Sequence, residues 1–248
     1  MGAEWATVLV PLILFLATII RSSFGFGEAL VAVPLLALVT PVEIAVPVAV
    51  LASITVALIA VVQDWHLIHF RDASRLVLST IVGIPIGLWL LKVVPEPVIK
   101  GVLAVIIIAF STYSLLSSRQ QELKTDRSAW LFGFTAGILG GAYGVNGPPL
   151  VIYGSLRRWS PQQFRATLQG YFLPASALGM CGFWIAGIWT PTVNRFYLLS
   201  LAPVIVATFL GRVINRNINA RQFVVYVHLV LIGIGIILMM QAMIGRLR

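Results

Sequence analysis

The 248-residue sequence predicts an all-α polytopic membrane protein with two inverted repeats, eight long transmembrane helices and two short half-helices after Gly-rich breaks. The first observation is the composition: 59% of the residues are hydrophobic and 10% are charged, against about a quarter charged in soluble domains. The second is a series of apolar stretches of helical length. The third is that both halves of the chain contain the same elements in the same order. The composition excludes a soluble globular domain and a disordered chain.

Ten apolar stretches are separated by short polar, Gly-rich or Pro-containing segments. Two of them, about 28–39 and 147–157, are too short to cross roughly 30 Å of hydrocarbon comfortably. The first long stretch lacks a basic segment before it, which indicates a retained helix and not a signal peptide. The long stretches lie at about 5–21, 42–63, 73–92, 97–117, 128–142, 162–187, 195–214 and 221–245.

A polar linker at about 118–127 divides a single integral membrane domain, 1–248, into repeats of about 1–117 and 128–248. In each repeat a long helix leads into a Gly-rich break, then a short helix, then three long helices. The break Phe24–Gly27 corresponds to Tyr143–Asn146. Each repeat has five segments, and because five is odd, the two repeats are expected to have opposite orientations in the bilayer, as in many secondary transporters.

Basic residues between the stretches predict the orientation, since Lys and Arg concentrate on the cytoplasmic side. If each short helix returns towards the side where its preceding long helix began, sixteen such residues divide into eleven on one face and five on the other. If the short segments continue their preceding helices, the same residues divide evenly. The uneven division favours the returns and predicts a bacterial inner-membrane protein with both termini periplasmic. The smaller group consists of Lys92, Lys100, Arg195, Arg246 and Arg248.

The two breaks are expected to meet near the middle of the bilayer, where non-helical backbone is tolerated only if it is covered by protein or lines a polar cavity. Each short helix would direct unpaired N–H groups and the positive end of its dipole into that cavity, which favours a small anion. A competing interpretation is that the glycines only allow close helix crossing. The predicted substrate-binding residues are Ser22, Ser23, Gly25, Phe26, Gly27, Tyr143, Gly144, Asn146, Gly147, Pro148 and Gln169.

Three charged residues are expected to act in coupling or charge balance. Glu28 begins a short helix, where it can complement the dipole, but an ionisable residue at membrane depth is also a candidate for proton coupling. Arg21 can pair with the anion and with Glu28, or it can mark the interface by extending towards water. Arg165 lies one turn before Gln169 on the same helix face, and its closeness to Pro161 favours an interfacial position.

Residues Gly25–Pro34 read GFGEALVAVP, residues Gly144–Tyr153 read GVNGPPLVIY, and FRATLQ follows at Phe164–Gln169. These motifs resemble the signatures of the sulfite exporter TauE/SafE family, also called the toluene sulfonate uptake permease family. Glu28 and Ala29 stand where glycines are usual in the family. The resemblance covers almost the whole chain and implies transport of sulfite or of an organosulfonate such as sulfoacetate, often as export.

The combined expectation is an exporter of a small sulfur-containing anion that works by alternating access, with the anion at the N-termini of two half-helices. A proton-coupled uptake permease and an anion channel for an organic anion are the alternatives. Export of a monovalent anion is favoured by about 2.3 kcal/mol per 100 mV and requires no coupled ion. An enzyme is disfavoured because no Ser/His, Cys/His or paired-carboxylate arrangement falls at membrane depth.

The expected partners are the small anionic substrate and the lipid bilayer, with no nucleic acid, and the sequence does not distinguish a monomer from a homodimer. No cofactor and no metal are expected. The segment Asp64–Asp72 contains two acids and two histidines, but no further cluster of His or Cys completes a metal site. Its acids and histidines are therefore interpreted as ordinary interfacial residues.

Overall fold

The computed structural model describes residues 3–36, 38–93, 95–116, 123, 125, 127–185, 187–217 and 219–245, and in this part of the chain the regular structure is entirely helical. A short 3-10 turn, Trp65–Leu67, joins α3 to α4. The helices of the first half are α1 (Ala3–Phe24), α2 (Glu28–Leu36), α3 (Val42–Asp64), α4 (Phe70–Val93) and α5 (Glu96–Leu116). Those of the second half are α6 (Ser128–Tyr143), α7 (Gly147–Leu156), α8 (Pro161–Ile185), α9 (Pro191–Asn217) and α10 (Ala220–Gly245).

The predicted all-α class is confirmed for these residues, and the apolar stretches coincide with the helices to within a few residues. Four helical stretches are long and apolar enough to cross a membrane by length and composition: Trp5–Phe24, Glu43–Leu67, Phe70–Leu90 and Pro191–Asn217. The crossing of the bilayer by eight helices remains a prediction.

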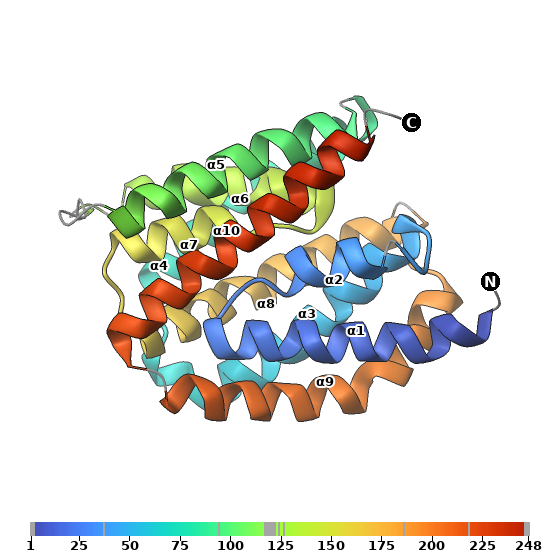
Figure 1. Cartoon of the computed structure of the whole chain (residues 1–248), viewed down its shortest axis with the longest axis horizontal. Coiled ribbons are helices and arrows are strands. Elements are labelled where there is room, and N and C mark those ends of the chain that lie inside the picture. The colour runs from blue at the N-terminus through green and yellow to red at the C-terminus, as the bar shows by residue number, and fades with distance from the viewer. Residues whose placement is uncertain are drawn as a thin grey trace.

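Glycine produces both breaks between a long helix and a short one. Gly25 and Gly27 have φ angles of 89° and 98°, and Gly144 has 67°, in the left-handed region that side chains with a Cβ rarely adopt. The Gly144 N–H donates to Gly140 O at 2.8 Å, which closes the last turn of α6. After each break the chain reverses, so α2 lies back along α1 and α7 along α6 (Figure 1).

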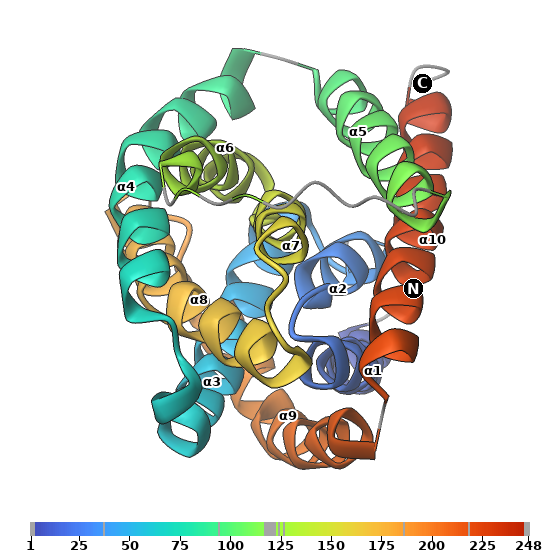
Figure 2. The same ribbon diagram turned by 90° about the vertical axis from the view of Figure 1, so that its left-hand side faces the viewer.

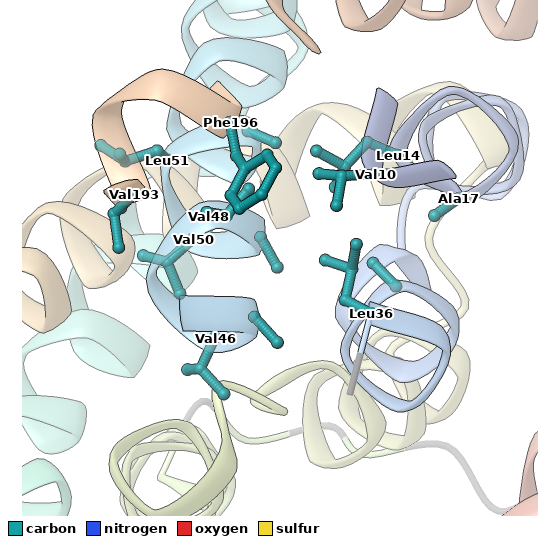
Figure 3. Close-up of a cluster of buried hydrophobic side chains, with 14 of the residues drawn as sticks. Val10, Leu14, Ala17, Leu36, Val46, Val48, Val50, Leu51, Val193 and Phe196 are labelled. Carbon is teal, nitrogen blue, oxygen red and sulfur yellow. The ribbon is translucent and has the colours of Figure 1, made fainter. Parts of the chain in front are cut away.

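The short helices lie inside the bundle, and the long helices surround them. Viewed from one end, α2 and α7 are near the centre of the molecule, while both chain termini lie towards the opposite end of the bundle (Figures 1 and 2). Figure 3 shows one buried cluster where α1, α2, α3 and α9 meet, with Leu14, Leu36, Val48 and Phe196 packed together. The cluster packs α1 and α2 against α3 and α9.

The helix pairs repeat between the halves. Helix α1 packs on α9 and α6 packs on α4, while α3 packs on α8 and α5 on α10. Glycines allow the closest approaches. A Cβ added at Gly211 of α9 would meet Ile19 O of α1 at 2.9 Å, and one added at Gly87 of α4 would overlap Ile138 O of α6. These two contacts occupy corresponding places in the two halves.

Candidate functional site

A cavity of about 50 Å³ lies between the two breaks. That volume accommodates roughly four water molecules, or one small oxyanion. The first break contributes Phe26, Gly27, Glu28 and Ala29, and the second contributes Gly144, Val145, Asn146 and Gly147. The predicted meeting of the breaks around one cavity thus agrees with the structure. The helices around them supply Arg21, Ala49, Val50, Ser53, Thr80, Ile84, Leu88, Gly140, Gly141, Phe172, Ala175, Ser176, Gly179 and Phe183.

Arg21 supplies the cation of the cavity wall and is only 3% exposed. Its Nη1 donates to Glu28 Oε2 and to Ser53 Oγ, both at 2.5 Å. Its Nε and Nη2 donate to Gln169 Oε1 at 3.2 and 2.8 Å. The guanidinium also lies 4.7 Å from the centre of the Phe172 ring. Of the two interpretations of Arg21, the structure therefore supports the buried ion pair and not an extension to the interface.

Glu28 begins α2 and is 2% exposed. Its Oε2 accepts from Arg21, and its Oε1 accepts from Thr18 Oγ1 at 3.0 Å. One buried positive charge and one buried negative charge therefore balance each other beside the cavity. Burial of either charge alone would be strongly unfavourable.

The second break supplies polar groups through Asn146. Thr80 Oγ1 donates to Gly133 O at 2.8 Å and lies 2.7 Å from the Tyr171 hydroxyl. Since Thr80 has a single hydroxyl hydrogen, Tyr171 donates to Thr80. The Asn146 amide lies close to the Tyr171 hydroxyl, whose oxygen can accept from it because its hydrogen is donated to Thr80. Tyr171 thus lies behind two residues of the cavity wall, Thr80 and Asn146.

The two short helices differ in the backbone donors that they can offer an anion. In the first turn of α2, residues Gly27 to Ala29 line the cavity, and N–H groups of a first turn have no partner within the helix. In α7 the corresponding turn contains Pro148 and Pro149, which have no N–H. The expected pair of equivalent anion-binding helix ends is therefore unequal, and α2 carries most of the backbone donors.

Several predicted residues lie behind the cavity wall instead of on it. Gln169 is 1% exposed, and besides accepting from Arg21 it donates through Nε2 to Gly25 O at 3.1 Å. A Cβ at Gly25 would meet Arg165 Cα at 3.1 Å, so this glycine permits close packing of α8. Pro148 is buried in the first turn of α7 and is not part of the lining. The side chain of Tyr143 falls outside the described residues.

Ser22 and Ser23 face α9 and not the cavity. A Cβ at Gly211 would meet Ser22 Cβ at 2.5 Å, and Asn215 Nδ2 donates to Ser23 O at 2.7 Å. Both hydroxyl oxygens are buried without a hydrogen-bond partner among the described residues. Their place at the interface of α1 and α9 is explained by helix packing and gives them no contact with the cavity.

Arg165 is not part of the cavity lining and belongs to an ion cluster at the end of α3. It is 5% exposed and pairs with Asp64, and Arg212 Nη2 lies 2.6 Å from the other oxygen of the same carboxylate. The expected interfacial depth of Arg165 stays a prediction, and the structure adds that its side chain is buried inside the protein. Burial of the side chain follows from its position on the inward face of α8, whereas sequence distance from Pro161 says nothing about helix rotation.

The acids of the segment Asp64–Asp72 are also buried in contacts inside the protein, while the interfacial depth expected for this segment stays a prediction. Asp72 is 3% exposed, accepts from the Tyr153 hydroxyl at 3.2 Å and lies 3.6 Å from Arg157 Nη2. His69 stacks on Trp159. Within the described ranges, no group of three or more His, Cys, Asp or Glu side chains is placed to hold a metal ion.

Four hydroxyl side chains at the cavity were not predicted from the sequence. Ser53 and Ser176 line the cavity 3.2 Å apart, Thr80 lines its other side, and Tyr171 lies behind Thr80. All four lie within apolar stretches of spanning length. A hydroxyl in such a stretch is the signal that could have found them, because hydroxyls inside a membrane protein need a partner.

Comparison with known proteins agrees with the motifs at the two breaks. No match was found among curated proteins or among solved structures. The model of the family described as sulfite exporter TauE/SafE matches residues 10–238, which include both breaks, the cavity and the Asp64 cluster. The chain therefore belongs to the sulfite exporter TauE/SafE family of membrane transporters for sulfur-containing anions.

Proposed function

We propose that this protein exports a small sulfur-containing oxyanion, sulfite or a short organosulfonate, and binds it in the cavity beside Arg21 and the first turn of α2. The observation that carries the proposal is that both breaks, a buried guanidinium and a first helical turn converge on one cavity. Guanidinium groups and unpaired backbone N–H groups are the donors that oxyanions prefer.

The size of the cavity favours the smaller substrates. About 50 Å³ holds sulfite, whereas sulfoacetate adds a carboxylate and a methylene group. Among the described residues that line the cavity, Arg21 is the only cation, so a second charged group has no cation to pair with. We infer that inorganic sulfite fits this conformation better than a dianionic sulfonate.

The Arg21–Glu28 pair sets a condition on binding. An arriving anion competes with the Glu28 carboxylate for Arg21, and two anions beside one cation repel each other. Substrate binding is therefore coupled to protonation or displacement of Glu28. This contact is also the specific observation that favours the second candidate, proton-coupled uptake, in which Glu28 would carry the proton.

Alternating access between two inverted repeats is the proposed mechanism. The repeated pairing of α1 with α9 and of α6 with α4 supports a pseudo-twofold relation between the halves, as do the matching Gly87 and Gly211 contacts. Eight long helices would cross the inner membrane, with both termini periplasmic. The location of both termini at one end of the bundle (Figure 1) supports that topology.

Purified protein in proteoliposomes tests the proposal. We expect sulfite to stabilise the protein against heat and to leave vesicles loaded with it, faster when the membrane potential favours anion exit. The double variant Arg21→Gln/Glu28→Gln keeps the interior neutral but removes the cation, so sulfite binding should be lost. Ser22→Ala, buried outside the cavity, is the matched control. Unchanged sulfite binding in the double variant would place the site elsewhere.

The same vesicles separate a carrier from a channel. A carrier that alternates its access should move labelled sulfite faster when unlabelled sulfite is present on the opposite side, because a loaded carrier returns faster than an empty one. Flux indifferent to that counter-substrate would indicate a channel.

A further inference from the structure

The Asp64 cluster lies at one end of the bundle and the cavity lies towards the other. On α3, Asp64 follows the cavity residue Ser53 by eleven residues, or about 16 Å of helix. On α8, Arg165 precedes the cavity residue Phe172 by seven residues, or about 10 Å. At the opposite end, Phe183 of α8 still lines the cavity. About 10–16 Å of helix therefore separates the cluster from the cavity along α8 and α3.

The cluster joins the two halves of the chain. Asp64 of α3 accepts from Arg165 of α8 through one oxygen and from Arg212 of α9 through the other. Arg212 also donates to Gln63 Oε1 at 2.5 Å. One carboxylate of the first half therefore holds two guanidinium groups of the second half. Phe164, which precedes Arg165 in the sequence, contacts Phe26 of the first break.

An ion cluster is suited to a contact that must open and close. A buried ion pair gains little net free energy over its separated, hydrated ions, because desolvation offsets most of the attraction. The charges are therefore stabilised in the closed state, where they pair with one another, and also in the open state, where water hydrates each of them. An apolar contact, by contrast, loses the free energy of burial over its whole area each time that it opens to water.

The corresponding positions of the other repeat carry different chemistry. The correspondence of Thr40-Pro41 with Ser160-Pro161 places Trp184 opposite Asp64 and Ala45 opposite Arg165 in the repeat. The correspondence of Gly87 with Gly211 places Leu88 opposite Arg212. The equivalents of the three charged residues are thus all apolar.

The sign of the charge suits an anion. Two guanidinium groups face one carboxylate, and Arg216 lies near enough to act electrostatically on Arg165. Arg212 Nε is buried without a hydrogen-bond partner among the described residues, so Asp64 does not saturate the donors around it. An oxyanion that passes this point is attracted and not repelled.

We propose that Asp64, Arg165 and Arg212 form the gate that closes the cavity at this end, the cytoplasmic end in the proposed topology. The role of this gate rests on the proposed transport function, but the opening of the gate can be measured without any substrate. Parting of the cluster lets α3 separate from α8 and α9 and admits water and substrate from that side.

Labelling of a single cysteine from each side tests the gate. Cys181, the only cysteine, is replaced by Ser, and Gly179→Cys places the thiol on the cavity wall, where a Cβ meets nothing within 4 Å. A membrane-impermeant cationic methanethiosulfonate is applied to right-side-out and inside-out vesicles. In Asp64→Asn we expect labelling from the cytoplasmic side to rise at least about tenfold, because the closed state loses its ionic contact.

Asp72→Asn is the matched control, since it also removes one buried carboxylate at the same end but one that contacts Tyr153 and Arg157. A comparable rise in this control would overturn the proposal, because loss of any buried acid would then be sufficient. If Asp64→Asn does not fold, Arg212→Gln replaces it. This side chain is 19% exposed, and its loss leaves the Asp64–Arg165 pair in place, so a smaller rise in the same direction is expected.

The two proposals can fail separately. Unchanged cytoplasmic labelling in Arg212→Gln and Asp64→Asn, with sulfite export intact, would overturn the gate and leave the function standing. Raised labelling in a protein that neither binds nor moves sulfite would overturn the function and leave the gate standing.

Discussion

Arg21 and Glu28 form a buried ion pair across the first break, with 2.5 Å between Nη1 and Oε2 and side-chain exposures of 4% and 1%. Arg21 lies in the last turn of α1 and Glu28 in the first turn of α2, so the pair joins the two helices around Gly25 and Gly27. Arg21, the cation that would hold a substrate anion, is thus already paired with an anion of the protein, the Glu28 carboxylate. Removal of each partner therefore has opposite effects on anion binding.

Glu28→Gln should bind sulfite about tenfold more tightly while it lowers the melting temperature of the empty protein. The substitution leaves the Arg21 charge without its counter-ion, which destabilises the empty cavity and favours any anion that replaces the carboxylate. Thermal unfolding with and without sulfite measures both effects. The pH dependence of sulfite flux should also flatten if Glu28 carries the proton, and an unchanged pH profile would remove that role.

Gln169→Leu should raise the sulfite concentration for half-maximal transport by about tenfold with a smaller change in maximal rate, because two hydrogen bonds that orient Arg21 are lost. Transport kinetics in proteoliposomes make the measurement. Gln163→Leu on the same helix is the control, since Gln163 only caps the start of α8 at Ser160. Equal effects from the two variants would contradict an orienting role for Gln169.

Tyr171→Phe should weaken sulfite binding a few-fold, since the Asn146 amide loses the oxygen that can accept from it. Isothermal calorimetry measures the affinity. Tyr197→Phe is the matched control: its hydroxyl also bonds a threonine, Thr55, at 2.7 Å, but neither residue lines the cavity. Weakened binding in the control would show that loss of a tyrosine hydroxyl away from the cavity also acts on the site indirectly.

Gly87→Ala and Gly211→Ala should each destabilise the protein, by about 1–3 kcal/mol, because the added methyl group meets backbone of the facing helix. Gly87→Ala is expected to be the more severe, as its methyl group would overlap Ile138 O. Gly233→Ala, where a Cβ meets nothing within 4 Å, should be neutral or stabilising. Melting temperatures of the three variants in detergent compare them. Equal stability in all three would argue against close packing of α4 on α6 and α1 on α9.

The sequence predicted the helices and the two breaks well, because hydropathy and glycine act locally. The Gly25 and Gly144 positions need left-handed backbone, and that requirement is visible in the residue type itself. The face that each side chain presents depends on helix rotation, which is set by tertiary packing. For this reason Ser22 and Ser23 were expected in the cavity but lie against α9.

Charged residues were the hardest to place from the sequence. Asp64 stands beside Trp65 and His66, a composition typical of a membrane interface, yet it is buried between two arginines from distant parts of the chain. Partners that are 101 and 148 residues away leave no local pattern. Arg21 and Glu28 are only seven residues apart, and so their pairing could be named as one of two alternatives.

Pro148 and Pro149 make the two ends of the proposed carrier chemically unequal. If both short helices offered the same backbone donors, an inverted repeat would give the states open to either side nearly equal free energies. Because the cavity-lining first turn with free N–H groups belongs to α2, the proposed mechanism predicts that the anion stays with the first half of the chain. Under the proposed alternating access, the empty transporter is then expected to favour one of its two states before any gradient is applied.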